Sequence, residues 1–124
     1  MKYLTLIIIL LCLTIKVNAY KITDVYRLLN TGSCQFGDLS GVDLSFRNLD
    51  GVNLSMAYLE GANLSRTDFR DSNLRKVNFS NANLFQATLE GSNVEGAVFY
   101  NARNVNFKGT RGAGFWAIDY PETE

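Results

Sequence analysis

Two pairs of carboxylates have the residue types that acid–base catalysis requires. Asp68 and Asp71 stand three residues apart. Glu90 and Glu95 stand five apart. Such groups act as acid and base when a pocket shifts their pKa values. The 124-residue sequence has no histidine and no glycine-rich phosphate loop, so it offers no Ser-His-Asp triad, Cys-His pair or zinc site. We therefore predict a non-enzyme with solvated carboxylates, no catalytic residue, no metal and no cofactor.

A second cluster of chemically capable residues is basic. Arg66, Arg70, Arg75 and Lys76 could bind an anion or a nucleic acid. The whole chain has twelve Lys and Arg against twelve Asp and Glu, so no net charge marks it for nucleic acid or for an acidic membrane surface. Whether the four cations form an anion site or join ion pairs depends on the element that carries them.

That element repeats every five residues. All thirteen residues at this spacing between Leu39 and Phe99 are bulky and apolar. These centres are Leu39, Leu44, Leu49, Leu54, Leu59, Leu64, Phe69, Leu74, Phe79, Leu84, Leu89, Val94 and Phe99. The residue before the centre is Asn or Asp in ten of the thirteen units, and the residue two before it is mostly small. A helix repeats its apolar face every 3.6 residues and a strand every two, so a fixed period of five predicts a solenoid.

The segments SGVDLS, EGANLS and SNANLF resemble the A-(D/N)-L-x-x unit of the pentapeptide repeat family, and the resemblance covers residues 37–101 without a gap. It implies an all-β solenoid, a right-handed quadrilateral β-helix in which four units make one coil of twenty residues. The centre and the small residue two before it then point into the shaft. The Asn or Asp before the centre suits a corner, where it can bond nearby backbone groups and tolerate unusual dihedral angles. Arg47 takes a small-residue position and is expected to leave the shaft at the open end of the first coil.

The twenty-residue coil also places charges above one another, at the interstrand spacing of about 4.8 Å. Asp50, Arg70 and Glu90 fall in one column. Arg75 and Glu95 fall in another. This register favours cross-strand ion pairs over an anion site.

Several large apolar residues fall at outward positions of the repeat. We interpret Phe46, Phe85 and Tyr100 as a candidate partner-binding face, with Met56 and Tyr58 close by in the first coils. Scattered exposed apolar residues are normal on soluble proteins, so ordinary surface residues remain the alternative.

The first nineteen residues have the features of a secretory signal peptide. Lys2 gives a basic start, residues 3–15 form an apolar run of 13 residues, and Ala19 ends a segment with small residues at the positions before a cut. An uncleaved anchor helix is the alternative. However, a bilayer-spanning helix needs about 20 residues, and this run is shorter. Lipoprotein-type cleavage at Cys12 would need a small residue before the cysteine. We predict cleavage after Ala19, a secreted or periplasmic protein without membrane association, and Cys34 as its single cysteine, without an intramolecular disulfide.

Residues 20–36 are expected to cover the first open end of the solenoid. Within KITDVYRLLNTG, residues 21–32, the apolar spacing predicts a short helix that Thr23 caps and Gly32 ends. Cys34 and Phe36 would join this helix to the first coil. We assign residues 37–109 to the β-helix.

The repeat loses its phase after Asn101. Asn104 stands where a centre was due, and a new unit forms around Phe107, three residues out of phase, which predicts a bulge or a loosened corner. Open ends of a β-solenoid need covers. Residues 110–124 are expected to form the second cover, with the apolar residues Phe115, Trp116, Tyr120 and Pro121.

Two function classes follow. We favour a non-catalytic secreted or periplasmic module with a structural or protein–protein interaction role and an unidentified protein partner. The resemblance implies an alternative, because some relatives resemble duplex DNA, bind DNA gyrase and protect it from quinolones or toxins. Those relatives imply a cytoplasmic, strongly acidic, longer and usually dimeric rod. This chain departs from them in its signal peptide, charge and length; its own oligomeric state stays open.

Overall fold

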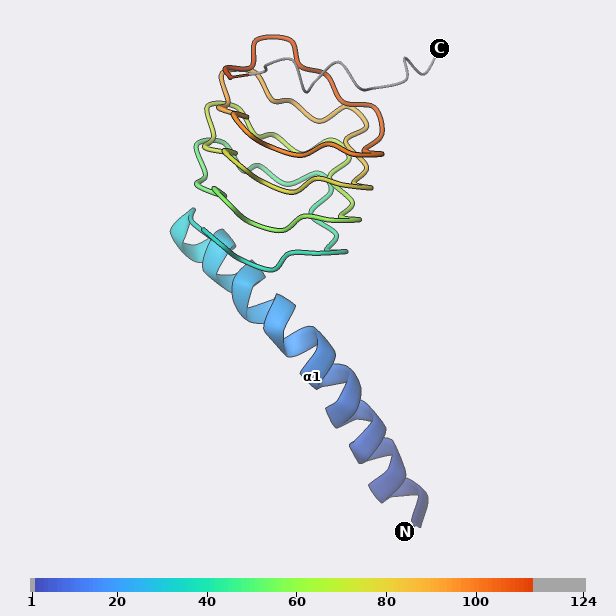
Figure 1. Cartoon of the computed structure of the whole chain (residues 1–124). Helices are drawn as coiled ribbons and strands as arrows, with labels where there is room; N and C mark the ends of the chain where they lie inside the picture. The colour runs from blue at the N-terminus through green and yellow to red at the C-terminus, as the bar shows by residue number, and fades with distance from the viewer. Residues whose placement is uncertain (1, 113–124) are drawn as a thin grey trace.

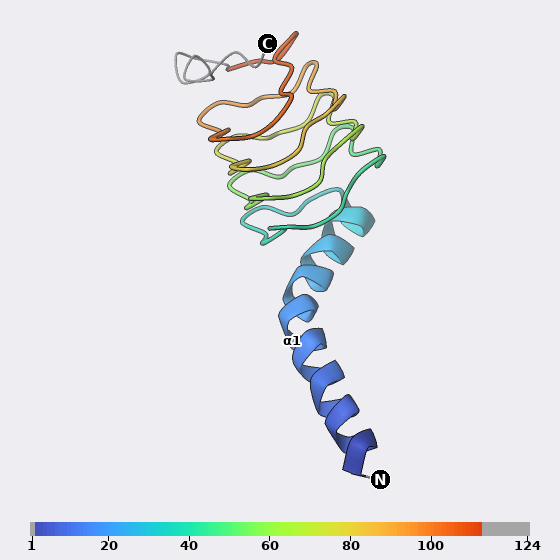
Figure 2. The ribbon, with the colours of Figure 1, turned by 90° about the vertical axis from the view of Figure 1, so that its right-hand side faces the viewer.

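The computed structural model describes residues 2–112, apart from the side chains of residues 8–21. One helix, α1 (Lys2–Thr31), leads into a stack of coils (Figure 1). The helix meets one end of the stack and leads away from it, and the same arrangement is seen after a quarter turn (Figure 2). Within the described part of the chain, no helix combines the length and the apolar character that a membrane crossing requires.

Helix α1 is longer than the sequence analysis predicts. It runs through residues 2–31 without a break, so Thr23 lies inside it and does not cap its start. The physical reason is that no proline or glycine occurs before Gly32, so nothing in the local sequence stops the helix. Gly32 ends it as predicted, with a φ of 67°, and its N–H bonds the carbonyl of Leu28 at 2.9 Å.

The coils are held together by isolated parallel bridges. Asp43 pairs with Asn63, Asn63 with Asn83, and Asn83 with Arg103, always at a spacing of twenty residues. The first bridge starts at Ser33, which makes Cys34 the centre of a unit that lies under Leu54. The predicted coil length of twenty residues is therefore confirmed.

The interior is filled as the repeat predicts. All thirteen predicted centres are buried, and none exposes more than 4% of its surface. The small residues between Val52 and Ala97 are buried too, whereas Val42 is half-buried and Arg47 is exposed at the first coil. Phe79 and Phe99 stack with ring centroids 4.9 Å apart, which is the distance expected of neighbouring coils.

Three polar residues occupy small-residue positions inside the shaft. Thr67 donates its hydroxyl to the carbonyl of Leu44 at 2.9 Å, and Ser72 donates to Leu49 at the same distance. Ser92 donates to Leu89 at 2.6 Å. Within the described residues every buried side-chain polar atom has a partner, so these hydroxyls enter the core without leaving an unpaired group.

The corners differ from the prediction in which residue takes the unusual dihedral angle. The Asn or Asp before each centre is the bridging residue, and its side chain accepts the backbone N–H two residues later, as Asn53 does from Ser55 at 3.2 Å. The unusual dihedral angle falls on the second residue after the centre, where φ lies between 53° and 73° in every unit from Gly41 to Asn101. Hydrogen bonding of the backbone by the Asn or Asp before the centre is thus confirmed. The expectation that this residue takes the unusual dihedral angle is wrong.

The last coil changes register. Asn93 pairs with Arg111, eighteen residues later, instead of the twenty seen elsewhere. The predicted shift around Phe107 is confirmed by this pairing and by the bond from the N–H of Gly91 to the carbonyl of Gly109. The ring of Phe107 meets that of Phe99 at 4.9 Å between centroids. The shortened coil keeps an aromatic ring over the end of the shaft. The apolar residues expected to form a second cover, Phe115, Trp116, Tyr120 and Pro121, lie outside the described residues.

Candidate interaction surfaces

Two of the four carboxylates considered for catalysis, Asp68 and Glu95, are held in ion pairs. Asp68 accepts two hydrogen bonds from Arg70 Nε, both at 2.9 Å. These bonds hold the pKa of Asp68 below its ordinary value, so this carboxyl is ionised and paired at neutral pH. Glu95 lies 3.2 Å from Arg75. Among the side chains that the structure describes, no three of His, Cys, Asp or Glu gather into a metal-binding group.

The basic cluster does not form a single anion site. Arg75 pairs with Glu95 one coil above, which confirms one predicted cross-strand pair. The pairing predicted for Arg70 is wrong. Among the described residues it makes an ion pair with Asp68 and none with Asp50 or Glu90. Asp68 is two residues away round the same corner, so its carboxylate reaches the guanidinium before those of the neighbouring coils do.

Arg66 contacts the residues directly below and above it in the neighbouring coils. Its guanidinium lies 5.2 Å from the ring centroid of Phe46, one coil below. Its Nε donates to Gln86 Oε1, one coil above, at 2.8 Å. The cation therefore bridges three coils at one corner, and its contact with Phe46 is the cation–π geometry that arginine favours.

The candidate partner-binding face is exposed but not continuous. Phe46, Phe85 and Tyr100 expose 69%, 45% and 76% of their surfaces. The twenty-residue register brings Phe46 and Phe85 to the same corner, two coils apart. Tyr100 lies at the neighbouring corner, so a side of the coil separates it from the other two.

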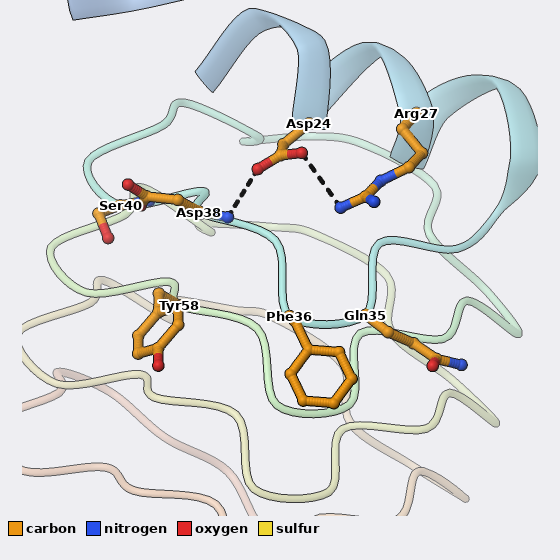
Figure 3. A pocket seen from close by; sticks show the side chains of 7 residues that line it. All are labelled: Asp24, Arg27, Gln35, Phe36, Asp38, Ser40 and Tyr58. Atoms are coloured by element: carbon orange, nitrogen blue, oxygen red, sulfur yellow. Dashed lines mark hydrogen bonds and ion pairs between the residues drawn. The ribbon is translucent and has the colours of Figure 1, made fainter. Parts of the chain in front are cut away.

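The structure adds a pocket that the sequence did not predict (Figure 3). It is an open hollow of about 570 Å³ where α1 meets the first two coils. Its lining residues are Asp24, Arg27, Gln35, Phe36, Asp38, Ser40 and Tyr58. Phe36 and Tyr58 expose 67% and 54% of their surfaces there. The only sequence signals were Tyr58 at an outward position and Phe36 in the connecting segment.

Charged groups join the helix to the first coil beside this pocket. Asp24 accepts the backbone N–H of Asp38 at 2.8 Å and pairs with Arg27 at 3.1 Å (Figure 3). Asp38 in turn accepts the N–H of Ser40 at 3.0 Å. These contacts fix the angle at which the helix leaves the coil. The charged groups that line the pocket are the carboxylates of Asp24 and Asp38 and the guanidinium of Arg27.

Cys34 lies buried behind the same contacts. Arg27 donates to its sulfur at 3.2 Å, and the thiol donates to the carbonyl of Asp24 at 3.4 Å. Burial raises the pKa of the Cys34 thiol, although the Arg27 hydrogen bond acts in the opposite direction. A buried thiol with a raised pKa is a poor nucleophile, so Cys34 packs the end of the shaft and offers no reactive group.

Coils of twenty residues, a filled interior and outward columns of side chains define this protein as a β-solenoid. The family model for pentapeptide repeats matches residues 38–75, 62–101 and 78–111 of the chain, with eight copies. The chain belongs to the pentapeptide repeat family, and its fold is the right-handed β-helix of that family. No curated protein sequence matches the chain significantly.

Several solved structures are similar to the chain. HetL, a pentapeptide repeat protein involved in heterocyst differentiation regulation in the cyanobacterium Nostoc sp. strain PCC 7120, is 28% identical over 66% of this chain and 39% of its own, with a TM-score of 0.33. The Nostoc protein alr5209 is 32% identical over 64% of this chain and 74% of its own, with a TM-score of 0.29. A pentapeptide repeat protein of the Arabidopsis thaliana thylakoid lumen is 27% identical over 69% of this chain and 66% of its own, with a TM-score of 0.28. The chain thus spans less than half the length of HetL, and the family assignment rests on the family match.

Proposed function

We propose that the protein is a non-catalytic module that presents side chains of its coils to a protein partner. The observation that carries the proposal is the division between inward and outward positions. The thirteen predicted centres and most of the small residues two before them are buried. The residues between them face outward in columns at a fixed spacing. A filled shaft leaves no enclosed site for a substrate, whereas rigid columns suit recognition of another surface.

The proposal includes a four-sided cross-section. A coil of twenty residues contains four bridging residues, such as Ser33, Asp38, Asp43 and Asn48, each followed by a turn of the chain. Four equal turns per coil favour four flat sides. Each side would then present one outward bridging residue per coil, flanked by the residues of two corners.

We also propose that the protein is exported and cut after Ala19, which is supported by the basic start and the apolar run of residues 3–15. The contacts of α1 with the first coil described above come from Asp24 and Arg27, which follow the proposed cut. A processed protein would therefore keep these contacts. Sequencing the N-terminus of the protein from its native cells tests this point: Tyr20 is expected, and an intact Met1 on a cytoplasmic protein would contradict export.

The interaction function is tested by crosslinking in the native cells, followed by mass spectrometry. Phe85→Ala removes an exposed side chain and should weaken capture of the partner by about 1 kcal/mol or more if that corner is the contact, with an unchanged melting temperature. Arg70→Gln is the matched control, because Arg70 lies at a different corner and pairs with Asp68. Loss of capture with Arg70→Gln alone would place the contact on another side.

The gyrase alternative is tested in parallel. A DNA mimic needs a long negative field, but Arg66, Arg75 and Lys76 interrupt the acidic surface in the middle coils. A supercoiling assay with the protein and gyrase should therefore show no inhibition. Inhibition at a protein concentration comparable to that of gyrase would overturn the module proposal in favour of the alternative.

A further inference from the structure

One side of the solenoid carries an acid at one end and a base at the other. Parallel bridges connect Asp43, Asn63, Asn83 and Arg103, one residue from each coil. We call this column and its flanking corners the 43–103 face. Three coil steps separate Asp43 from Arg103, which is about 14 Å at the interstrand spacing. Neither residue forms an ion pair with any other described residue, and both are exposed.

The same polarity runs through the whole stack. Residues 33–52 contain three acidic and one basic residue, a net charge of −2. Residues 53–72 have three acidic and two basic residues, a net −1, and residues 73–92 have one acidic and two basic, a net +1. Residues 93–112 have one acidic and three basic residues, a net +2. The charge therefore rises from coil to coil and changes sign at the middle, between the second and third coils.

The corners beside the column vary in bulk in a matching way. At the corner that follows the column, the first residue after the centre is Ser45, Ser65 and Phe85 in the first three coils, and the second is Phe46, Arg66 and Gln86. At the corner that precedes it, the residues of the four coils are Ser40, Glu60, Ser80 and Tyr100. At the first of the two positions of each corner, a small residue therefore lies as far below the middle of the stack as the aromatic residue lies above it.

We propose that the partner of the 43–103 face is a second copy of this chain, packed side by side and antiparallel around a twofold axis between the second and third coils. This axis places Asp43 of each copy opposite Arg103 of the other. It places Asn63 opposite Asn83, where the side-chain N–H of Asn63 can donate to Asn83 Oδ1, which accepts one bond within its own turn. It also sets Phe85 against Ser65 and Tyr100 against Ser40, so that large side chains meet small ones. The proposal rests on the interaction function proposed above and names its partner.

The antiparallel arrangement follows from the charges. A twofold axis along the stack would place Asp43 against Asp43 and Arg103 against Arg103, and like charges opposite one another are destabilising. Antiparallel packing instead opposes Asp43, the only charge of the face in the first coil, to Arg103, its only charge in the fourth, while the face has no net charge in the two middle coils. The contact is isologous and closes after two copies. Helix α1 does not obstruct it, because the helix leads away from the end of the stack and not along its side (Figures 1 and 2).

The contact is small, so the dimer is weak. One side of four coils is about 14 Å tall between its outermost strands. A side of this height buries a much smaller area than the roughly 800 Å² per partner of a standard interface. We expect association at high protein concentration and low salt, and dissociation when salt screens the charged pairs.

Charge reversal in the full-length chain tests the proposal, with sedimentation velocity as the readout over a range of protein and salt concentrations. Arg103→Glu should raise the dissociation constant of the dimer at least about tenfold, because it sets two carboxylates opposite each other at both ends of the interface. Lys108→Glu makes the same change of charge in the same coil, but at a corner away from the face, and should leave the dissociation constant within about twofold of the wild type. The double variant Asp43→Lys with Arg103→Glu restores opposite charges and should recover association. Melting temperatures verify that all variants fold.

The outcomes separate the dimer from the broader function. A chain that stays monomeric at low salt and high concentration overturns the dimer, and so does an equal effect of Arg103→Glu and Lys108→Glu. Association through α1 would survive every one of these variants and would overturn it too. Crosslinking to a different protein by a chain that never dimerises would leave the interaction function standing. A chain that dimerises as described but crosslinks only to itself in its native cells would limit that function to self-association.

Discussion

The regular coils and the junction between α1 and the first coil are stabilised in different ways. In the coils, every unit makes the same contacts, so Leu44, Leu64 and Leu84 occupy equivalent buried positions one coil apart. At the junction each contact occurs once. Asp24 accepts the N–H of Asp38, fourteen residues away, and no other unit among the described residues has a counterpart of this bond. Repetition supplies stability in the coils, whereas specific single contacts supply it at the end.

Gly37 and Cys34 show how the junction departs from the repeat. Gly37 occupies the small-residue position of its unit, where the next coils have Ala57, Val77 and Ala97. A Cβ atom at Gly37 would lie 2.1 Å from the sulfur of Cys34, which is far inside the contact distance. The position that tolerates a methyl group or more in the coils must therefore be glycine at the junction.

The largest expected effect tests the coils. Leu64→Ala leaves a cavity between Leu44 and Leu84 and should lower the free energy of unfolding by about 2–5 kcal/mol. Ser65→Ala, one residue later and partly exposed, should lower it by less than about 0.5 kcal/mol. Urea unfolding of both variants measures the difference. Similar losses at the two positions would contradict the division into inward and outward residues.

A smaller effect is expected at the junction. Gly37→Ala forces a methyl group against the Cys34 sulfur and should destabilise the protein by about 1–3 kcal/mol, as overpacking does. Its φ is not in the left-handed region, so backbone strain adds nothing. In a Cys34→Ala background the same change should cost clearly less, because the sulfur is gone. A double-mutant cycle measured by urea unfolding gives this coupling, and additive losses would show that the two side chains do not compete for the same space.

The smallest effect is the alkaline pH dependence that the junction thiol Cys34 contributes. Burial raises the pKa of Cys34 in the folded protein, so the unfolded chain loses its thiol proton first as the pH rises. Stability from this group is fully present below the unfolded pKa of about 8.5 and is lost as the pH rises toward the folded value. Unfolding measured from pH 7 to 10 should therefore weaken more steeply in the wild type than in Cys34→Ala, which keeps every other titrating group. Parallel pH profiles would show that the thiol is equally protonated in both states.

Much of the interior could be predicted because its information is local and repeated. Each unit has to fill the same space, so a bulky centre such as Leu64 and a small residue such as Ala62 mark their own inward positions. The corners were harder to predict. The sequence shows Asn or Asp before the centre, but the left-handed conformation falls on a residue as variable as Phe46, Gly51 or Arg66. The position in the turn, rather than the residue type, decides that conformation.

Surface pairs were predictable only in part. The register placed Arg75 below Glu95 correctly, and their side chains lie 3.2 Å apart. Arg70 has carboxylates on several sides, and the choice of Asp68 depends on the path of its flexible side chain round the corner. The junction pocket could not be predicted from the sequence, because it combines residues of α1 with residues of two coils, and no repeat relates the two groups.

The sequence by itself determined the period of five, the bulky inward positions and the loss of phase near Asn104, while the coil of twenty residues followed from the family resemblance. These features arise from a constraint that every unit repeats, namely that apolar side chains of similar size must stack at the strand spacing. Only the tertiary structure decided the uninterrupted length of α1, the contacts of Asp24 and Arg27 with the first coil, and the register of eighteen residues at Arg111. Those features depend on contacts that occur once, between residues distant in the chain, and a periodic pattern contains no information about them.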